Sequence, residues 1–154
     1  MRVLHVFAPA AYGGLERVVQ TLAAAQQATG DAVHVAAIVS GGAPPATLDQ
    51  LTGMLVSGGV QVHRLEFPAR RYLRERAAIE ELGRRVGTQI VHTHGFHPDV
   101  VDGTVARRIG AARKAVVYQW ESRKRTPSPV FWERIRRLDD RGASPAARRL
   151  ICGT

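Results

Sequence analysis

Two short groups of residues in this sequence have the types and spacing to bind a ligand. The first is a pair of glycines, Gly13 and Gly14, which separates an apolar run from a segment with helical periodicity. The second is the segment HTHGFHPD, which places His92, His94 and His97 at i, i+2 and i+5. Amides at a helix start favour anions, and clustered imidazoles favour transition metals. Both possibilities follow from residue type and spacing alone.

The glycine pair precedes a helical segment whose first turn would offer unpaired N–H groups to an anion such as phosphate. The spacing matches neither the G-x-G-x-x-G dinucleotide fingerprint nor the P-loop, which needs Gly-Lys-Ser or Gly-Lys-Thr. A tight turn without a ligand therefore remains an open interpretation, because glycine also serves sharp backbone turns. We expect Glu16 to stabilise the helix start by interacting with the helix dipole, rather than to act in catalysis.

The three histidines of the second group are similar in spacing to the zinc-binding His-x-His-x-Asp-His signature of metallo-β-lactamase-like hydrolases. Phe96 stands where that signature needs Asp, and no histidine follows His97 in the chain. We therefore predict no metal site and no cofactor, and we expect His92 to order the core or the loop. A structural role is also expected of the histidines in strand-like runs, His5, His34 and His63.

Covalent catalysis has no visible candidate residue in the sequence. The Gly-x-Ser-x-Gly nucleophile motif is absent, and Cys152 is the single cysteine, next to the C-terminus and without a nearby base. One cysteine cannot form an internal disulfide, which fits a reducing cytoplasm. We expect neither a secretory signal nor a transmembrane segment, because no apolar stretch approaches the roughly 20 residues that span a bilayer.

Strand-like and helical patterns alternate around the two candidate groups. Apolar runs predict strands over 3–7, 32–39, 60–67, 90–93 and 115–118. Helical spacing predicts helices over 15–22, 46–55, 72–86 and 100–109, the last ending at Gly110. This alternation predicts an α/β fold, a Rossmann-like parallel sheet with helices on both faces. Both candidate groups follow strands, so we expect them at the carboxyl edge of that sheet.

The basic charge of the chain lies mainly in its last third. The net charge is +9, but residues 1–110 carry 11 arginines and 9 acidic residues, whereas residues 111–154 carry 11 basic and 4 acidic residues. The alternating pattern also ends there, apart from a possible short helix over 131–138. We interpret 113–154 as an atypical basic tail, and we expect no nucleic-acid partner because no basic and aromatic platform accompanies it.

Three segments together resemble the N-terminal domain of family 4 glycosyltransferases, which are retaining enzymes of the GT-B fold. They are MRVLHVFAPAAYGGLERVVQTLA, GGVQVHRLEF and IVHTHGFHPDVVDGTVARRIG, in an order and spacing that match the family. The resemblance implies an incomplete N-terminal domain over 1–112 that holds mainly the acceptor, and a nucleotide sugar bound largely by a second domain. It also implies substrate-binding roles for Gly13 and Gly14, near the donor phosphates, and for His94 and Gly95, toward the acceptor.

The sequence departs from the family after residue 112. The segment AVVYQWESRKR lacks the Thr-x-His motif of the next strand, and the Glu-x-seven-Glu signature of the donor domain is absent. We therefore expect a truncated or frameshifted fragment, inactive by itself as a hexosyltransferase. The alternative is a non-catalytic binding remnant or partner subunit that docks a separate donor domain. The segment ARRYLRERAAIEELGRR leaves open peripheral contact with the inner face of a membrane, near a sugar or lipid-linked acceptor.

Overall fold

A computed structural model describes residues 1–9, 13–40 and 47–116, and every structural statement below concerns these residues. The chain divides into two compact units, Met1–Tyr118 and Gln119–Thr154, and the described residues all lie in the first. The predicted short helix over 131–138 lies outside the described residues, as does the predicted tail from residue 117 onward. The first residues of that tail, 113–116, belong to a strand over Ala112–Val116, which begins three residues before the strand predicted over 115–118.

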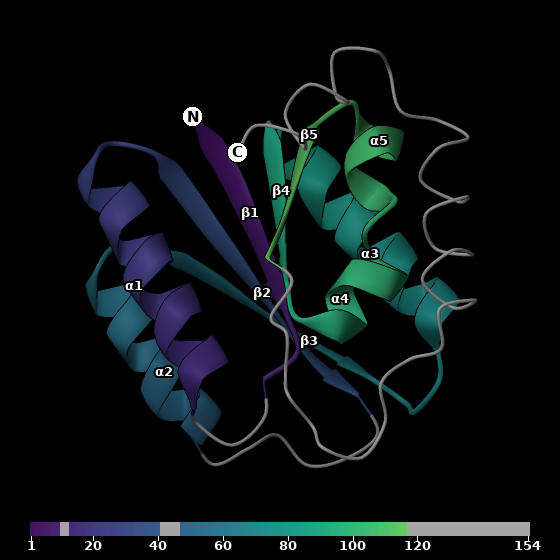
Figure 1. The fold of residues 1–154 in the computed structure, drawn as a ribbon, viewed down its shortest axis with the longest axis horizontal. Coiled ribbons are helices and arrows are strands. Elements are labelled where there is room, and N and C mark those ends of the chain that lie inside the picture. Colours follow the sequence, from purple (N-terminus) through teal and green to yellow (C-terminus); the bar gives the residue numbers. More distant parts are fainter. Residues whose placement is uncertain (10–12, 41–46, 117–154) are drawn as a thin grey trace. The chain divides into compact units, whose positions relative to one another are not determined.

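Five parallel strands form one sheet in the order β3-β2-β1-β4-β5. In chain order the strands are β1 (Arg2–Phe7), β2 (Ala32–Ser40), β3 (Gln61–Phe67), β4 (Ile90–His94) and β5 (Ala112–Val116). The chain builds outward from β1 through β2 to β3, and then crosses back to add β4 on the other side of β1 (Figure 1). The gap between β1 and β4 is therefore the point at which the strand order reverses, where sheets of this type open a crevice for ligands.

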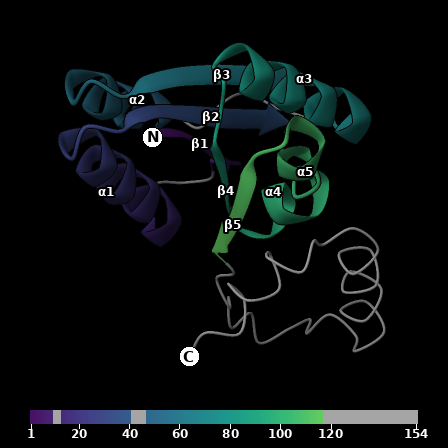
Figure 2. The same cartoon turned by 90° about the horizontal axis from the view of Figure 1, so that it is seen from above.

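Helices cover both faces of the sheet. One face carries α1 (Gly14–Ala28) and α2 (Thr47–Ser57), and the other carries α3 (Tyr72–Arg85), α4 (Phe96–Val101) and α5 (Val105–Ile109) (Figures 1 and 2). Each parallel pair of strands needs such a crossover, and the connections are short. The predicted Rossmann-like sheet with helices on both faces is confirmed. No helix among the described residues combines the length and the apolar character that crossing a bilayer requires.

The period of two along each strand divides the core into two layers. On the first face Phe7 and the odd-numbered residues of β2 pack against Val19 and Ala23 of α1 and against the leucines of α2. On the second face Leu4 and Val6 pack against Ile79 and Leu82 of α3 and against α5. Central strands buried on both faces explain why β1 and β2 read as continuous apolar runs rather than as alternating ones.

Two sequence expectations on the second half of the domain were wrong in detail. The helix expected over 100–109 is two short helices, α4 and α5, separated by Asp102, Gly103 and Thr104. The HTHGFHPD segment is not a loop, because β4 continues through His94 and α4 begins at Phe96. The end of the second helix at Gly110 is confirmed, since this residue caps α5 with a φ of 73° in the left-handed region.

Candidate functional site

The two groups of residues singled out in the sequence meet at the carboxyl edge, beside the gap between β1 and β4. The first turn of α1 follows β1, and Gly95 follows β4, which pairs with β1 from Val3↔Ile90 to Phe7↔His94. A Cβ placed on Gly95 would lie 3.4 Å from Cδ2 of Leu15 in the first turn of α1. The start of α1 and the end of β4 are thus direct neighbours, as expected from their places in the sequence.

Gly13 and Gly14 form the start of α1 without needing glycine for backbone reasons. Gly13 is the N-cap residue, with φ −148° and ψ −153°, an extended conformation open to any residue. Its N–H donates to Oε2 of Glu16 at 2.9 Å, so the acid of the first turn stabilises the helix start as predicted. Gly14 is exposed, and a Cβ placed on it would meet no atom within 4 Å. Neither backbone strain nor packing therefore explains the glycine at position 14.

Gly95, by contrast, is required by its backbone. Its φ of 84° and ψ of 172° lie in a region that is essentially restricted to glycine. This conformation turns the chain directly from β4 into α4, so that His94 ends a strand and Phe96 begins a helix. His94 and Gly95 are thus adjacent at a defined turn, and their role in substrate binding stays a prediction.

His94 belongs to a group of three buried imidazoles on the face that α1 covers. His5 lies opposite His92 in the parallel register of β1 and β4, and His94 is two residues further along β4. Their relative exposures are 0% for His5, 2% for His92 and 0% for His94. The ring centroids of His92 and His94 lie 4.1 Å apart with a stacked geometry, and the other two pairs lie 5.1 Å apart.

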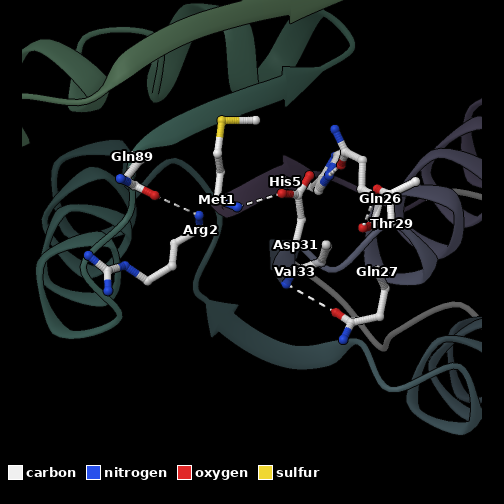
Figure 3. Close-up of polar contacts among 9 residues, drawn as sticks. All are labelled: Met1, Arg2, His5, Gln26, Gln27, Thr29, Asp31, Val33 and Gln89. Atoms are coloured by element: carbon white, nitrogen blue, oxygen red, sulfur yellow. Dashed lines mark hydrogen bonds and ion pairs between the residues drawn. The ribbon is translucent and has the colours of Figure 1, made fainter.

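A chain of hydrogen bonds runs through two of these rings to α1. Nε2 of His94 lies 2.8 Å from Nδ1 of His5, and Nε2 of His5 lies 2.7 Å from Oε1 of Gln26. Figure 3 shows Gln26 of α1 beside His5, together with Gln27, whose Oε1 accepts from the N–H of Val33 at 3.1 Å. Among the described residues, Nε2 of His92 and Nδ1 of His94 have no hydrogen-bond partner.

Burial keeps the imidazole group neutral. It lowers the pKa of His94 to about 2 and that of His92 to about 4, and in each case the charge of neighbouring histidines adds to the effect. Burial also lowers the pKa of His5, against the hydrogen bond to Gln26. A charged imidazole would lose its hydration here, which is why all three rings stay unprotonated at neutral pH.

Three neutral imidazoles are also a donor set that suits zinc or copper. One nitrogen of each ring lies within 4.8 Å of the others. However, the rings of His92 and His94 are stacked with an interplanar angle of 30°, whereas an ion bound by both would need a lone pair from each ring directed at the same point. The absence of a metal site therefore stays a prediction. The histidines that the structure brings together are His5, His92 and His94 rather than His92, His94 and His97.

His97 lies apart from that group, in a surface pocket between α3 and α4. The pocket has a volume of about 270 Å³ and is lined by Tyr72, Arg76, Phe96, His97, Val100 and Val101. Its walls are mainly apolar, and Phe96 and Tyr72 are 56% and 44% exposed. Because it adjoins the start of α4 at the end of β4, it lies at the edge where α/β sheets bind ligands.

A buried carboxylate orients His97. Nε2 of His97 donates to Oε1 of Glu75 at 2.6 Å, and Glu75 is 1% exposed. This hydrogen bond, more than any other cause, raises the pKa of His97. Burial first, and then the charge of the neighbouring Glu75, raise the pKa of Asp102. The pocket wall thus holds an imidazole that carries a proton more readily than usual.

Sequence reasoning found the glycines and the second histidine group, but not their partners. It grouped His92, His94 and His97 by spacing, whereas the structure groups His5 with the first two and pairs His97 with Glu75. Gln26 and Glu75 carried no motif: Glu75 was one charge in a predicted helix, and Gln26 lay beyond the end of the helix predicted over 15–22, which in the structure continues to Ala28. The available signal was the register of the two strands, since His5 and His92 occupy equivalent positions in neighbouring parallel strands.

Comparison with known proteins identifies one family. The sequence profile of Glycosyltransferase Family 4 matches residues 12–154. This match continues through 113–154, which we interpreted as an atypical tail, and the boundary at 112 stays a prediction. No curated protein sequence matches the chain significantly.

One of three similar solved structures supports the fold. The complex of leucoanthocyanidin reductase with NADPH from Vitis vinifera is 15% identical, with a TM-score of 0.54, and the match covers 92% of this chain and 45% of the reductase. A universal stress family protein from Burkholderia pseudomallei has 13% identity and a TM-score of 0.43 over 74% of this chain and 94% of that protein. A predicted subunit of a tRNA methyltransferase from Methanocaldococcus jannaschii has 13% identity and a TM-score of 0.41, and the match covers 91% of this chain and 76% of that protein. At such identity the reductase shows a shared Rossmann-like fold, and this chain spans less than half its length.

Proposed function

This chain belongs to glycosyltransferase family 4, and from this membership we propose that its first unit is the acceptor-side half of a sugar-transfer site that uses a nucleotide-sugar donor. Gly13 and Gly14 contribute backbone near the donor phosphates, and His94 and Gly95 face the acceptor. One observation carries the proposal: both groups lie at the carboxyl edge beside the β1–β4 pair, where a Cβ on Gly95 would lie 3.4 Å from Leu15, the residue after Gly14. That gap is where sheets of this class bind their ligands.

Gly14 gives this proposal its most specific support. The fold has room for a side chain at position 14, since a Cβ would meet nothing within 4 Å. A glycine that neither strain nor packing requires is expected where a ligand approaches the backbone. The start of a helix of 15 residues also presents N–H groups to a phosphate.

The pocket beside His97 is a candidate for the acceptor. Its volume of about 270 Å³ is near the lower end of small-molecule sites, which suits one ring of a larger acceptor. We propose that the aromatic walls cover the faces of a sugar ring while His97 and Arg76 contact its polar groups. No metal or other cofactor has a part in this proposal.

Ligand titration of the ¹⁵N-labelled chain tests the site. The probes are a panel of uridine, guanosine and adenosine diphosphate sugars, and a panel of free monosaccharides. We expect the amide shift of Gly14 to change with the nucleotide sugars, and those of Gly95, Phe96 and His97 to change with the monosaccharides that stand for the acceptor, whereas Gly53 in α2 serves as a distant control. Changes at Gly53 alone, or none at millimolar ligand, would contradict the proposed site.

We further propose that this unit needs a donor-binding half to turn over. Incubation of the chain with each nucleotide sugar and an acceptor panel is expected to yield no glycosyl product, and addition of a donor-binding half is expected to restore product. Product from the chain alone would overturn this part. The runner-up, a non-catalytic module that docks a donor-binding partner, predicts partner binding without any ligand-induced shift at Gly14 or Gly95.

Peripheral membrane contact at the inner, cytoplasmic face is the third part of the proposal. Arg70, Arg71 and Arg74 are exposed at the start of α3, next to Leu73, which is 78% exposed. Glu75 lies on the same turn but is buried and hydrogen-bonded to His97, so it does not itself contact headgroups. Such a surface suits anionic lipid headgroups and a lipid-linked acceptor.

Flotation with vesicles of phosphatidylglycerol and phosphatidylcholine tests the membrane contact. We expect the chain to float with the anionic vesicles, and Arg74→Glu combined with Leu73→Ser to abolish flotation. The matched control, Arg107→Glu in α5, keeps the same charge change on another exposed surface. Equal flotation of all three proteins, or of none, would remove the membrane contact from the proposal. We also expect the chain to bind neither RNA nor DNA at low or at high salt concentration.

A further inference from the structure

With Oε1 of Gln26 facing His5, the hydrogen-bonded row of Gln26, His5 and His94 indicates the tautomers of the two imidazoles. The row begins on α1, crosses β1 and ends on β4, and its two contacts are 2.7 and 2.8 Å long. An amide oxygen only accepts hydrogen bonds, so Nε2 of His5 must carry the proton that Oε1 of Gln26 receives. A neutral imidazole has one N–H, and Nδ1 of His5 is therefore an acceptor.

The assignment passes from His5 to His94. Since Nδ1 of His5 has no proton, Nε2 of His94 must donate the hydrogen bond between the two rings. The single N–H of neutral His94 is then at Nε2, and Nδ1 carries no proton and can only accept a hydrogen bond. That atom has no partner among the described residues, and the whole residue is 0% exposed. The side chain of Gln26 thus determines which atom of His94 is left to accept.

A buried acceptor without a partner is costly unless something donates to it. His94 ends β4 at the carboxyl edge, directly before the turn at Gly95 and next to the first turn of α1. A group that donates one hydrogen to Nδ1 would complete the row, and it reaches this atom only if the residues that cover His94 move aside. A protonated imidazole would offer no lone pair, and burial prevents that state by lowering the pKa of His94 to about 2.

We infer that Gln26 and His5 are positioning residues that hold His94 with Nδ1 free to accept a hydrogen bond from a hydroxyl group of the bound sugar. The identification of the donor as a sugar hydroxyl rests on the proposed function, whereas the arrangement of protons does not. A hydroxyl suits this site because it donates without a charge, and the surrounding imidazoles offer no counter-charge. The ring of His92 stacks on the face of the His94 ring, with 4.1 Å between the ring centroids, and so limits its rotation.

Metal binding at the same histidines makes the opposite prediction. An ion bound by Nδ1 of His5 would also take Nε2 of His94, the nearest nitrogen, and the remaining proton of His94 would then move to Nδ1. The hydrogen-bonded row requires the proton on Nε2 and the metal site requires it on Nδ1. The ring nitrogens of His94 therefore distinguish the two.

Histidine-ring ¹⁵N NMR on the full chain is the test. The shifts of the two ring nitrogens separate protonated from bare nitrogen, and we expect both His5 and His94 to be in the Nε2–H form without any ligand. Gln26→Leu removes the acceptor and is expected to convert His5 and His94 to mixed forms, whereas Gln26→Glu keeps an acceptor and the wild-type forms. Gln27→Leu is the matched control, because Gln27 binds the N–H of Val33 rather than a histidine.

Ligand titration then tests the hydroxyl. Using whichever monosaccharide or nucleotide sugar shifts the Gly95 amide, we expect the Nδ1 signal of His94 to move as it accepts, and affinity to fall about tenfold in Gln26→Leu only. An Nδ1–H form of His94 in the wild type, with or without added Zn²⁺, overturns the inference. So does a ligand that binds at Gly95 and leaves Nδ1 unmoved. If no ligand binds while the Nε2–H forms are found, the proposed function fails and the positioning by Gln26 stands.

Discussion

His5 Nδ1 and His94 Nε2 lie 2.8 Å apart, although 89 positions separate the two residues in the chain. They meet because β1 and β4 are neighbours in the sheet, in a register that pairs His5 with His92. The consequence is a buried group of neutral rings at the point where the strand order reverses. Four expectations about stability and ionisation follow from this group and from the turns around it.

Replacing His92 with leucine is expected to reduce the sensitivity of the fold to acid. The pKa of His92 is lowered to about 4 in the fold, so between its ordinary value of 6.5 and that value the unfolded chain binds a proton that the fold excludes. The free energy of unfolding therefore falls as pH drops below 6.5, by roughly 2 to 3 kcal/mol at pH 4 from this residue. Urea unfolding at pH 7 and pH 4 measures the difference, and an equal loss in His92→Leu would contradict it.

The two glycines of the site are expected to respond differently to alanine. Gly95→Ala forces a side chain into φ 84° and ψ 172°, and its free energy of unfolding is expected to fall by about 1–3 kcal/mol. Gly14→Ala meets no atom within 4 Å and is expected to fold with at least the wild-type stability. Thermal unfolding compares the two variants. Weakened nucleotide-sugar binding in a stable Gly14→Ala protein would assign that glycine to the ligand, and a destabilised protein would assign it to the turn.

Gly103 between α4 and α5 is expected to tolerate no side chain. A Cβ there would lie 2.3 Å from the backbone oxygen of Asp99, which cannot move without displacing α4. Gly103→Ala is therefore expected to cost about 1–3 kcal/mol of unfolding free energy. The matched control is Gly53→Ala, exposed in α2 with no neighbour within 4 Å, which is expected to gain roughly 0.4–1 kcal/mol. The same sign for both changes in chemical unfolding would refute the steric argument.

Glu75→Gln is expected to lower the pKa of His97. The hydrogen bond to the buried carboxylate is the main cause that raises this pKa, and a neutral amide keeps the acceptor but removes the charge. NMR titration of the histidine rings measures the effect directly. Glu81→Gln, an exposed change on the same helix, is the control and is expected to leave His97 unchanged. The rings of His5 and His94 face the other side of the sheet and are expected to keep their titration behaviour.

Most of the sheet was predictable from the sequence because its strands are short apolar runs. Residues 3–7, 32–39 and 60–67 match β1, β2 and β3 within one residue at each end. Buried parallel strands produce such runs directly, and glycine and proline mark the turns between them. The error in the helix predicted over 100–109 has a physical reason. The apolar spacing continues across α4 and α5, but the helix is interrupted at Gly103, where the backbone lies close to the carbonyl oxygen of Asp99.

The candidate site was less predictable because its contacts depend on strand order. Gly13, Gly14 and the HTHG segment were visible as unusual local patterns. The partners of His94 were not, since the contact with His5 arises only when β4 joins β1 rather than β3. The pairing of His97 with Glu75 likewise depends on how α3 packs beside α4, and a buried glutamate looks in the sequence like one more charge on a surface helix.

The position of β4 next to β1 also affects how the chain folds during synthesis. β2 and β3 leave the ribosome soon after β1 and can pair at once, whereas the other edge of β1 has to wait until residue 94 has emerged. During that interval the nascent chain exposes the backbone edge and apolar side chains of its most central strand, a state prone to intermolecular strand pairing. We therefore expect the strand order β3-β2-β1-β4-β5 to make the yield of this domain depend on the translation rate and on chaperones that cover β1.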